Sequence, residues 1–224
     1  MDYREMKKEE RGACAELAAR AFDDYEYFTV YFPRDERRYR FLRSMIDTEF
    51  RVNDGLEVFL TAKEGDRTVA AAILCRPGYI KPSAAAYLRG GFWKSMLYGG
   101  FRDVSAWDRM EYEAFGPCRE MNRKDAWYLN MLVVSPDRKG EGIGSRMLQE
   151  CLIPYVKEHG GKKLCLFTNS QGNRQFYRKN GFTEFDERQF AYKGKTIGSW
   201  SLQKQCTMHN AQCIMIRLQR GKNN

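Results

Sequence analysis

The sequence contains no long hydrophobic run. Its longest apolar stretches, such as Val69 to Cys75, are far shorter than the roughly 20 residues that a membrane-spanning helix needs. The first residues, MDYREMKKEE, are charged from the second position and include no apolar segment of the kind found in secretory signals. We therefore expect a cytoplasmic protein with no membrane partner.

Metal-binding patterns are also missing from the sequence. The chain has two histidines and seven cysteines, and no cysteine pair has the spacing that zinc sites use. Most of the cysteines lie among apolar neighbours, as expected of reduced, buried thiols in a reducing compartment. His159, beside the glycines that end a helix, and His209, in a polar stretch, are expected at the surface. The sequence therefore predicts no metal site.

The composition is that of a folded, basic protein. With 224 residues, of which 43% are hydrophobic, the chain can bury a core as a single domain spanning residues 1–224. A net charge of +9 would suit a polyanionic ligand such as nucleic acid, an acidic membrane or a phosphorylated cofactor. The densest basic run, residues 34–43, alternates with apolar side chains and is typical of a solvated helix face. We therefore expect no nucleic-acid partner.

The spacing of hydrophobic residues predicts both helices and strands. Helices are expected at residues 8–22, from Pro33 onward, at about 143–155, at 172–179, and once or twice within 79–125. Strands are expected at residues 56–62, 68–75, 127–134, 163–168, from the turn at 181–182 to residue 190, and at 213–218 after an irregular polar stretch. Because Pro154 lies inside its helix, where a lost hydrogen bond costs about 3 kcal/mol, we expect a kink or a change of helix type near Leu152.

The order of these elements predicts an α/β fold around one sheet. The first two strands are joined by a short turn with Gly65 and are expected to form a hairpin. The strand–helix–strand unit over residues 127–168 is expected to place its two strands parallel. Residues 79–125, rich in aromatics and glycine, are the least readable part of the chain.

A glycine-rich loop connects the strand and the helix of that unit. Gly140, Gly142 and Gly144 occupy every second position, so the backbone can approach a ligand while the following helix offers free N–H groups. Arg138 and Lys139 add two cations, which together predict a phosphate-binding loop. The loop is neither a P-loop, since no Gly-Lys-Ser/Thr follows, nor the G-x-G-x-x-G of dinucleotide-binding folds.

Two motifs in this region match one known family. Val134-Ser135-Pro136 is followed by Lys139-Gly140-x-Gly142-x-Gly144, and N-x-x-F-Y-x-x-x-G-F occurs from Asn173 to Phe182. In this the chain resembles the GNAT superfamily of acetyl-CoA-dependent N-acetyltransferases. It departs from the family pattern at Lys139, where glutamine or arginine is usual, so the planar fork that could grip a pyrophosphate is missing there.

The resemblance implies a fold and a coenzyme site. The implied fold is a mixed, mostly antiparallel central sheet with a parallel β-α-β coenzyme-binding unit, flanked by helices, with a coenzyme-binding core at 127–182 and an acceptor-side insertion at about 79–125. Acetyl-CoA is the implied co-substrate, with its pantetheine arm along the main chain before the loop and its pyrophosphate in the loop. The implied binding residues are Leu132, Val133, Val134, Arg138, Lys139, Gly140, Glu141, Gly142, Ile143, Gly144, Ser145 and Asn173.

Acetyl transfer to an amine needs a base and an acid. With a lysine-like pKa near 10.4, only roughly one amine in a few thousand is neutral at pH 7, so a base or a desolvating site is required. The resemblance implies that Tyr177 protonates the leaving thiolate. Glu111 and Glu113 both precede the strand at residues 127–134, and we take Glu113 as the candidate base. The aromatic residues of the insertion could wall an acceptor pocket or pack in the core; they are Tyr87, Phe92, Trp93, Tyr98 and Trp107.

The function expected from these features is transfer of an acetyl group to a primary amine of a small molecule, by direct attack in a ternary complex. Two alternatives stay open: acetylation of a protein or peptide, and a non-catalytic module that senses acyl-CoA. The sequence does not identify the amine, and it does not distinguish an acetyl donor from a longer acyl donor. A homodimer is compatible with it.

Overall fold

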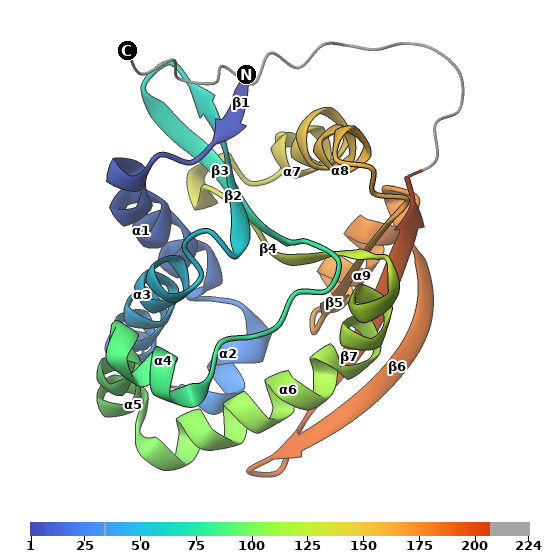
Figure 1. Ribbon diagram of the computed structural model, residues 1–224. Helices are drawn as coiled ribbons and strands as arrows, with labels where there is room; N and C mark the ends of the chain where they lie inside the picture. The colour runs from blue at the N-terminus through green and yellow to red at the C-terminus, as the bar shows by residue number, and fades with distance from the viewer. Residues whose placement is uncertain (34, 207–224) are drawn as a thin grey trace.

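The computed structural model describes residues 1–33 and 35–206, and its centre is one mixed sheet. Over these residues the sheet has seven strands in the order β1-β2-β3-β4-β5-β7-β6 (Figure 1). They are β1 Asp2–Glu5, β2 Glu57–Glu64, β3 Arg67–Cys75, β4 Trp127–Val134, β5 Lys163–Thr168, β6 Thr183–Tyr192 and β7 Lys195–Gln205. Strands β4 and β5 are parallel and all other neighbours are antiparallel, which confirms the predicted fold class.

Helical segments flank the sheet. The α-helices are α1 Arg11–Phe22, α2 Glu26–Tyr31, α3 Asp35–Val52, α4 Ala84–Tyr87, α5 Trp93–Gly99, α6 Phe101–Lys124, α7 Ile143–Arg146, α8 Ile153–Glu158 and α9 Gln171–Lys179. Figure 1 shows α7 and α8 on one side of the sheet and α1, α2 and α3 on the other. Among the described residues, no helix is both long enough and apolar enough to cross a membrane.

Alternate strand residues face two separate cores, as the two-residue period of a strand requires. On β3, Ala70, Ala72 and Leu74 pack in one core with the helical segment 143–156, whereas Ala71 and Ile73 pack in the other with α1 and α3. Both faces of the central strands are therefore covered. This explains why the strands read as nearly continuous hydrophobic runs rather than as an alternating pattern.

The expected irregularity near Leu152 is present. A π-helical turn, Met147–Leu152, separates α7 from α8, and Pro154 lies in the first turn of α8. Proline is tolerated there because its missing N–H costs nothing in the first turn of a helix. The helix then ends before Gly160, whose φ of +75° a residue with a side chain rarely adopts.

Residues 79–125 form more helices than the one or two expected. The segment contains α4, a π-helical turn Leu88–Phe92, α5 and the 24-residue helix α6. Gly91 and Gly100, the second glycines of its two Gly-Gly-Phe tripeptides, have φ of +111° and +86°. Each tripeptide therefore reverses or kinks the chain between helices, a role that composition did not reveal.

Three further elements differ from the sequence-based expectations. The short strand β1 and the helix α2 were not predicted, and β7 occupies a stretch that was expected to be irregular. Polar residues such as Lys195 and Gln205 mask the pattern of β7, although Ile197, Trp200 and Leu202 are buried. The strand expected at residues 213–218 lies outside the described residues.

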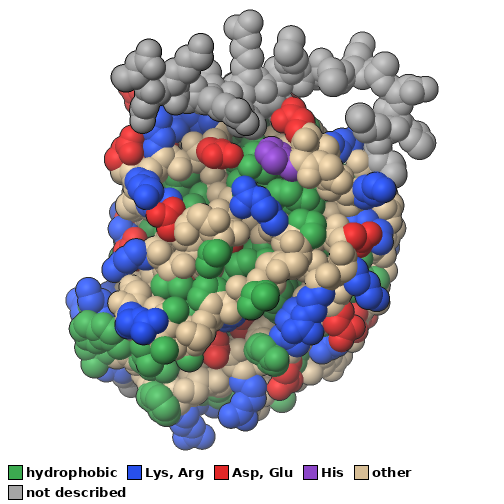
Figure 2. Space-filling view, in the orientation of Figure 1, with side chains coloured by type: hydrophobic (Ala, Val, Ile, Leu, Met, Phe, Trp, Pro, Cys, Tyr) green, Lys and Arg blue, Asp and Glu red, His purple; other side chains and the backbone are tan. Residues whose placement is uncertain are grey.

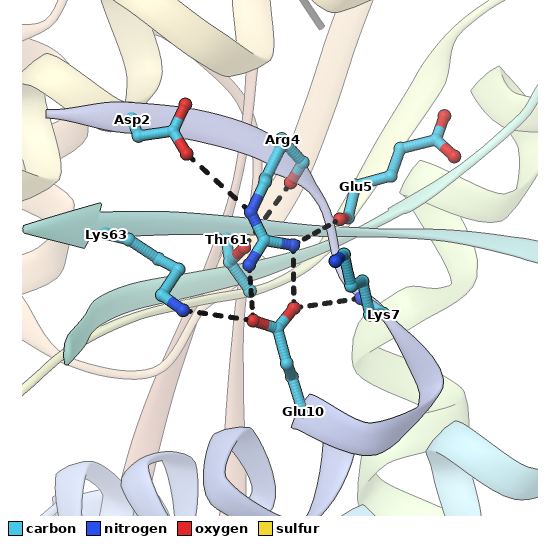
Figure 3. A network of polar contacts seen from close by, with 7 residues as sticks. All are labelled: Asp2, Arg4, Glu5, Lys7, Glu10, Thr61 and Lys63. Carbon is cyan, nitrogen blue, oxygen red and sulfur yellow. Dashed lines mark hydrogen bonds and ion pairs between the residues drawn. The ribbon is translucent and has the colours of Figure 1, made fainter. Parts of the chain in front are cut away.

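A network of charged residues ties β1 to the rest of the sheet (Figure 3). Both carboxylate oxygens of Glu10 accept hydrogen bonds from the guanidinium of Arg4, and Lys63 on β2 donates to the same carboxylate at 3.2 Å. The hydrogen bond from Arg4 lowers the pKa of Glu10 from its ordinary value of 4.5 to about 2. Side chains that are 14–17% exposed form this network, so water screens it only in part.

Glu10→Gln should therefore destabilise the fold by about 2 kcal/mol at neutral pH. Because the folded-state pKa is depressed, this stability is present above pH 4.5 and is lost as the pH falls toward 2. Chemical denaturation at pH 7 and pH 3 would measure it, with the exposed neighbour Glu9→Gln as the control. A constant difference between the Glu10 variant and the wild type at both pH values would contradict this account.

Candidate active site

The site begins where two neighbouring strands separate. Strands β4 and β5 pair only at Trp127 with Leu164 and at Tyr128 with Cys165. Beyond Tyr128 the main chain of β4 has no strand partner on the β5 side among the described residues. An extended ligand could pair with this stretch as an added strand does.

A bulge in β4 sets which side chains face the opening. Leu74 of β3 pairs with Leu129 and Ile73 pairs with Met131, so Asn130 is an extra residue on β4. The bulge changes the alternation of the strand: Leu129 belongs to the core of the 143–156 segment, whereas Met131 belongs to the core of α1 and α3. Asn130 itself lines the opening.

A cavity of about 700 Å³ occupies the space between the separated strands. Its walls come from β4, β5, α2, α3, α6 and α9, and most of its lining is aromatic or aliphatic. Figure 2 shows hydrophobic side chains gathered in the middle of this face, with charged side chains mainly around them. A largely apolar cavity with a few polar groups is typical of a small-molecule site.

Tyr177 enters this cavity from α9. The helix begins at Ser170, whose hydroxyl accepts a hydrogen bond from the N–H of Asn173 at 3.4 Å, and Asn173 also lines the cavity. Burial raises the pKa of Tyr177, and the nearby Tyr25 hydroxyl adds to that effect. Among the described residues, no hydrogen bond occupies the Tyr177 hydroxyl, which stays protonated at neutral pH and can act as a donor.

Tyr25 fixes the end of β5 beside the cavity. Its hydroxyl accepts a hydrogen bond from the N–H of Asn169 at 3.0 Å and shares another with the hydroxyl of Thr168 at 3.0 Å. Thr168 and Asn169 stand where β5 ends, so Tyr25 holds the strand end in place from α2. The sequence gave no sign of this contact, since α2 itself was not predicted.

The structure places Glu113, the candidate base, outside the cavity. Glu113 is exposed and does not line the cavity; its carbonyl oxygen accepts a hydrogen bond from Arg188. Glu111 lines the cavity instead, because residues two apart on a helix point to roughly opposite sides. Burial raises the pKa of Glu111 to about 7, and Tyr27 donates a hydrogen bond to its carboxylate.

The glycine loop leaves open space beside its backbone. Gly140 and Gly142 have φ of +91° and +74°, and no atom lies within 4 Å of where their side chains would be. Gly142 is the residue before α7, so the first N–H groups of that helix point toward the same open space. Gly144 serves packing instead, because a Cβ there would lie 3.2 Å from the ring of Phe176.

The two loop cations have different surroundings. Arg138 donates hydrogen bonds to Glu141 at 2.8 Å and to Glu64 at 2.8 Å, so its guanidinium is held by carboxylates. Lys139 is 81% exposed and lies 4.0 Å from Asp24. Lys139 is therefore the more available cation for a phosphate.

The remaining candidates divide between the cavity and the surface. Tyr87, Phe92 and Trp107 line the cavity, but Trp93 is 53% exposed and Tyr98 lies elsewhere. Leu132 lines the cavity, and Val133 and Val134 continue the same strand toward the loop. His159 is exposed and stacks on Tyr155, and His209 lies outside the described residues.

Two cavity residues were missed although a signal was present. Glu49 continues the apolar stripe of α3 that includes Leu42, Met45 and Ile46, so its spacing places a carboxylate on the buried side. Asn130 is the one polar residue in the run WYLNMLVV. A polar residue inside an apolar pattern is an indication of function, because its burial is costly.

Comparison with known proteins agrees with the family resemblance of the sequence motifs. Residues 106–184 match the family model of the acetyltransferase (GNAT) domain. No curated protein matches the chain by sequence.

Several solved structures share the fold at low identity. The histone acetyltransferase HPA2 and related acetyltransferase from Corynebacterium glutamicum is 15% identical with a TM-score of 0.58, over 94% of this chain and 98% of that one. The ribosomal-protein-S18-alanine N-acetyltransferase from Escherichia coli is 15% identical with a TM-score of 0.54, over 93% and 95%. The protein yncA from Salmonella typhimurium, solved with its cofactor acetyl-CoA, is 15% identical with a TM-score of 0.55, over 93% and 95%.

The matched residues 106–184 contain β4, which borders the cavity, the glycine loop, and α9, which carries Tyr177. This match identifies residues 106–184 as a GNAT acetyltransferase domain, and the solved structures show that the chain shares the fold of such proteins. Both findings support an acetyltransferase.

Proposed function

We propose that this enzyme transfers an acetyl group from acetyl-CoA to a primary amine of a small molecule, by direct attack in a ternary complex. The observation that carries the proposal is the cavity between β4 and β5, whose lining includes both Tyr177 and Glu111. A concave, largely apolar cavity with a few polar groups suits a small acceptor better than a folded protein surface. In this proposal residues 127–182 supply the coenzyme-binding core of a single domain, and residues 79–125 supply the acceptor side.

The residues present fit coenzyme A. On the side of β5, where it has no strand partner in the described chain, the main chain of β4 from Leu129 to Val134 can exchange hydrogen bonds with an amide-containing arm, as an added strand would. The N–H groups after Gly142 suit a pyrophosphate, and the open space around Gly140 leaves room for it. Lys139 adds a positive charge, and Asn173 lines the cavity on the side of α9.

Glu111 and Tyr177 divide the proton transfers. Glu111 accepts a proton from the acceptor ammonium, and its pKa of about 7 leaves it largely ionised just above neutral pH. The amine nitrogen then forms its bond to the acetyl carbon as the carbon–sulfur bond breaks. Tyr177 donates its proton to the departing thiolate. Burial raises the pKa of Tyr177, so its hydroxyl carries that proton until the thiolate leaves.

Release of free thiol from acetyl-CoA, measured across a panel of small amines and peptides with free N-termini, tests the proposal. Thiol release with small amines supports it, whereas release with peptides alone favours protein acetylation. Binding of acetyl-CoA without thiol release from any acceptor would identify a sensor and would reject the enzymatic proposal. Cytoplasmic location, independence of metals and a homodimer stay predictions from the sequence.

Tyr177→Phe should lower kcat about a hundredfold, since general acid catalysis contributes at least that factor. The affinity for acetyl-CoA should change by less than about twofold, because the ring and its packing stay. Steady-state kinetics and calorimetry measure the two quantities. Tyr155→Phe is the matched control, because Tyr155 is buried on α8 and its hydroxyl donates to Glu5 at 3.0 Å. An unchanged kcat in Tyr177→Phe would remove Tyr177 from the mechanism.

The pH dependence of turnover should report Glu111. At saturating amine, kcat should rise with an apparent pKa of about 7, because the ionised carboxylate is the active form. Glu111→Gln should abolish this step and lower kcat about a hundredfold. Glu113→Gln, two residues away on the exposed side of α6, should leave the profile unchanged. If the Glu111 variant keeps the wild-type profile, another group is the base.

Gly142→Ala should weaken acetyl-CoA binding roughly tenfold, because a side chain at φ of +74° costs about 1–2 kcal/mol and shifts the first N–H groups of α7. Gly65→Ala is the matched control: Gly65 also has a positive φ, of +58°, and open space around it, but it lies in the β2–β3 turn. Both variants should lose similar stability, and only Gly142→Ala should lose affinity. Equal affinity in both variants would exclude the loop from coenzyme binding.

A further inference from the structure

Two buried carboxyl groups meet at one amide beside the cavity. The side-chain amide of Asn130 donates to Glu49 at 3.2 Å and to Glu57 at 3.1 Å, and Cys75 donates to the same oxygen of Glu57 at 3.1 Å. Glu49 and Asn130 line the cavity. The other oxygen of Glu57 is buried without a hydrogen-bond partner in the described part of the chain. This cluster contacts neither Glu111 nor Tyr177 and is not used in the proposed proton transfers.

A chain of hydrogen bonds holds Glu49 in place. Tyr87 donates to Glu49 at 2.9 Å and accepts a hydrogen bond from the amide of Asn53 at 3.1 Å. The side-chain oxygen of Asn53, Oδ1, accepts a hydrogen bond from the hydroxyl of Tyr79 at 2.8 Å. Each oxygen of Glu49 thus accepts one hydrogen bond, whereas a carboxylate can accept about four in all. Glu49 is rigidly positioned and retains capacity for a further donor.

The carboxyl groups lie deeper in the cavity than the cations that also line it. Lys81 and Asp108 form an ion pair at 3.7 Å with side chains 43% and 54% exposed, so they belong to the rim. Arg109 is exposed as well. Glu49 and Glu111 are only partly accessible. Although the chain carries a net charge of +9, the interior of its cavity is acidic.

No salt bridge in the described residues reaches Glu49 or Glu57. Burial raises the pKa of Glu49, and burial together with repulsion from Glu49 raises the pKa of Glu57 well above its ordinary value. The positive charge of Lys81 at the rim opposes both shifts without cancelling them. A donor cation next to Glu49 would offset the cost of ionising these groups. Aromatic residues that also line the cavity, Tyr87, Phe92 and Tyr128, suit a cation better than an anion.

We propose that Glu49 binds a second amino group of the acceptor, so that the substrate is a diamine or a longer polyamine rather than a simple monoamine. The proposal rests on the proposed acetyl transfer and names the substrate class of the same cavity. One amino group of the acceptor loses its proton to Glu111 and is acetylated. The other stays protonated and donates to Glu49, while the alkyl chain between them lies along the apolar and aromatic walls.

Thiol release from acetyl-CoA should be measured with α,ω-diaminoalkanes and with n-alkylamines of matched chain length. For the wild type, kcat/KM should be about tenfold to a hundredfold higher for the best diamine than for its matched monoamine, which is the factor expected of a hydrogen bond between charged groups. In Glu49→Gln the ratio of kcat/KM for the diamine to kcat/KM for the matched monoamine should fall to about one. Glu36→Gln, an exposed residue of the same helix, is the control and should behave as the wild type.

Calorimetric binding of the same amines to the wild-type protein without acetyl-CoA provides a second measurement, independent of catalysis and of the folding of any variant. Tighter binding of the diamine supports the proposal. Equal binding, equal kcat/KM for both amine types, or a diamine preference that survives in Glu49→Gln would overturn it. Such equal turnover would overturn the role of Glu49 and leave the proposed acetyl transfer standing. Diamine binding without any acetyl transfer would overturn the proposed function and leave the cation site standing.

Discussion

The separation of β4 from β5 after Tyr128 is the constraint on which the site depends. A buried main chain must find hydrogen-bond partners, yet the outer half of β4 faces the cavity with none on that side among the described residues. The extra residue Asn130 contributes to this arrangement, because the bulge turns the strand and reverses the alternation of its side chains. A strand that cannot complete its own sheet is suited to hold an extended ligand, and the glycine loop at its end is suited to hold the charged part of that ligand.

The polar residues around this gap are expensive to bury. Glu49, Glu57 and Glu111 all have raised pKa values because they are removed from water. Residues chosen for stability alone would be apolar at such positions, as they are along most of β3. The two cores on either side of the sheet supply the stability that tolerates these groups. The concentration of costly residues in and beside one cavity is a physical indication that this part of the molecule carries its chemistry.

The sequence predicted the regular parts of the molecule and the position of the glycine loop between β4 and α7, because those depend on local patterns. The β2–β3 hairpin, the parallel unit and the change of helix type before Pro154 follow from hydrophobic spacing and from backbone chemistry. The sequence did not predict which of two nearby glutamates lines the cavity. Glu111 lines it and Glu113 does not, and telling them apart requires knowing which face of α6 points inward. Tyr25 could not be predicted, since its role depends on a contact with Thr168, far away in the sequence.

The order of the strands also leaves β6 at one border of the sheet, and β1 at the other. An unpaired border strand invites a second chain to extend the sheet, which is a common route to aggregation. In β6 the ladder with β7 shifts between Glu184 and Asp186, and Glu187 and Arg188 are exposed charges. Irregularity and charge of this kind discourage intermolecular strand pairing, and β1 spans only four residues. Association between copies by pairing of these described strands is thereby disfavoured.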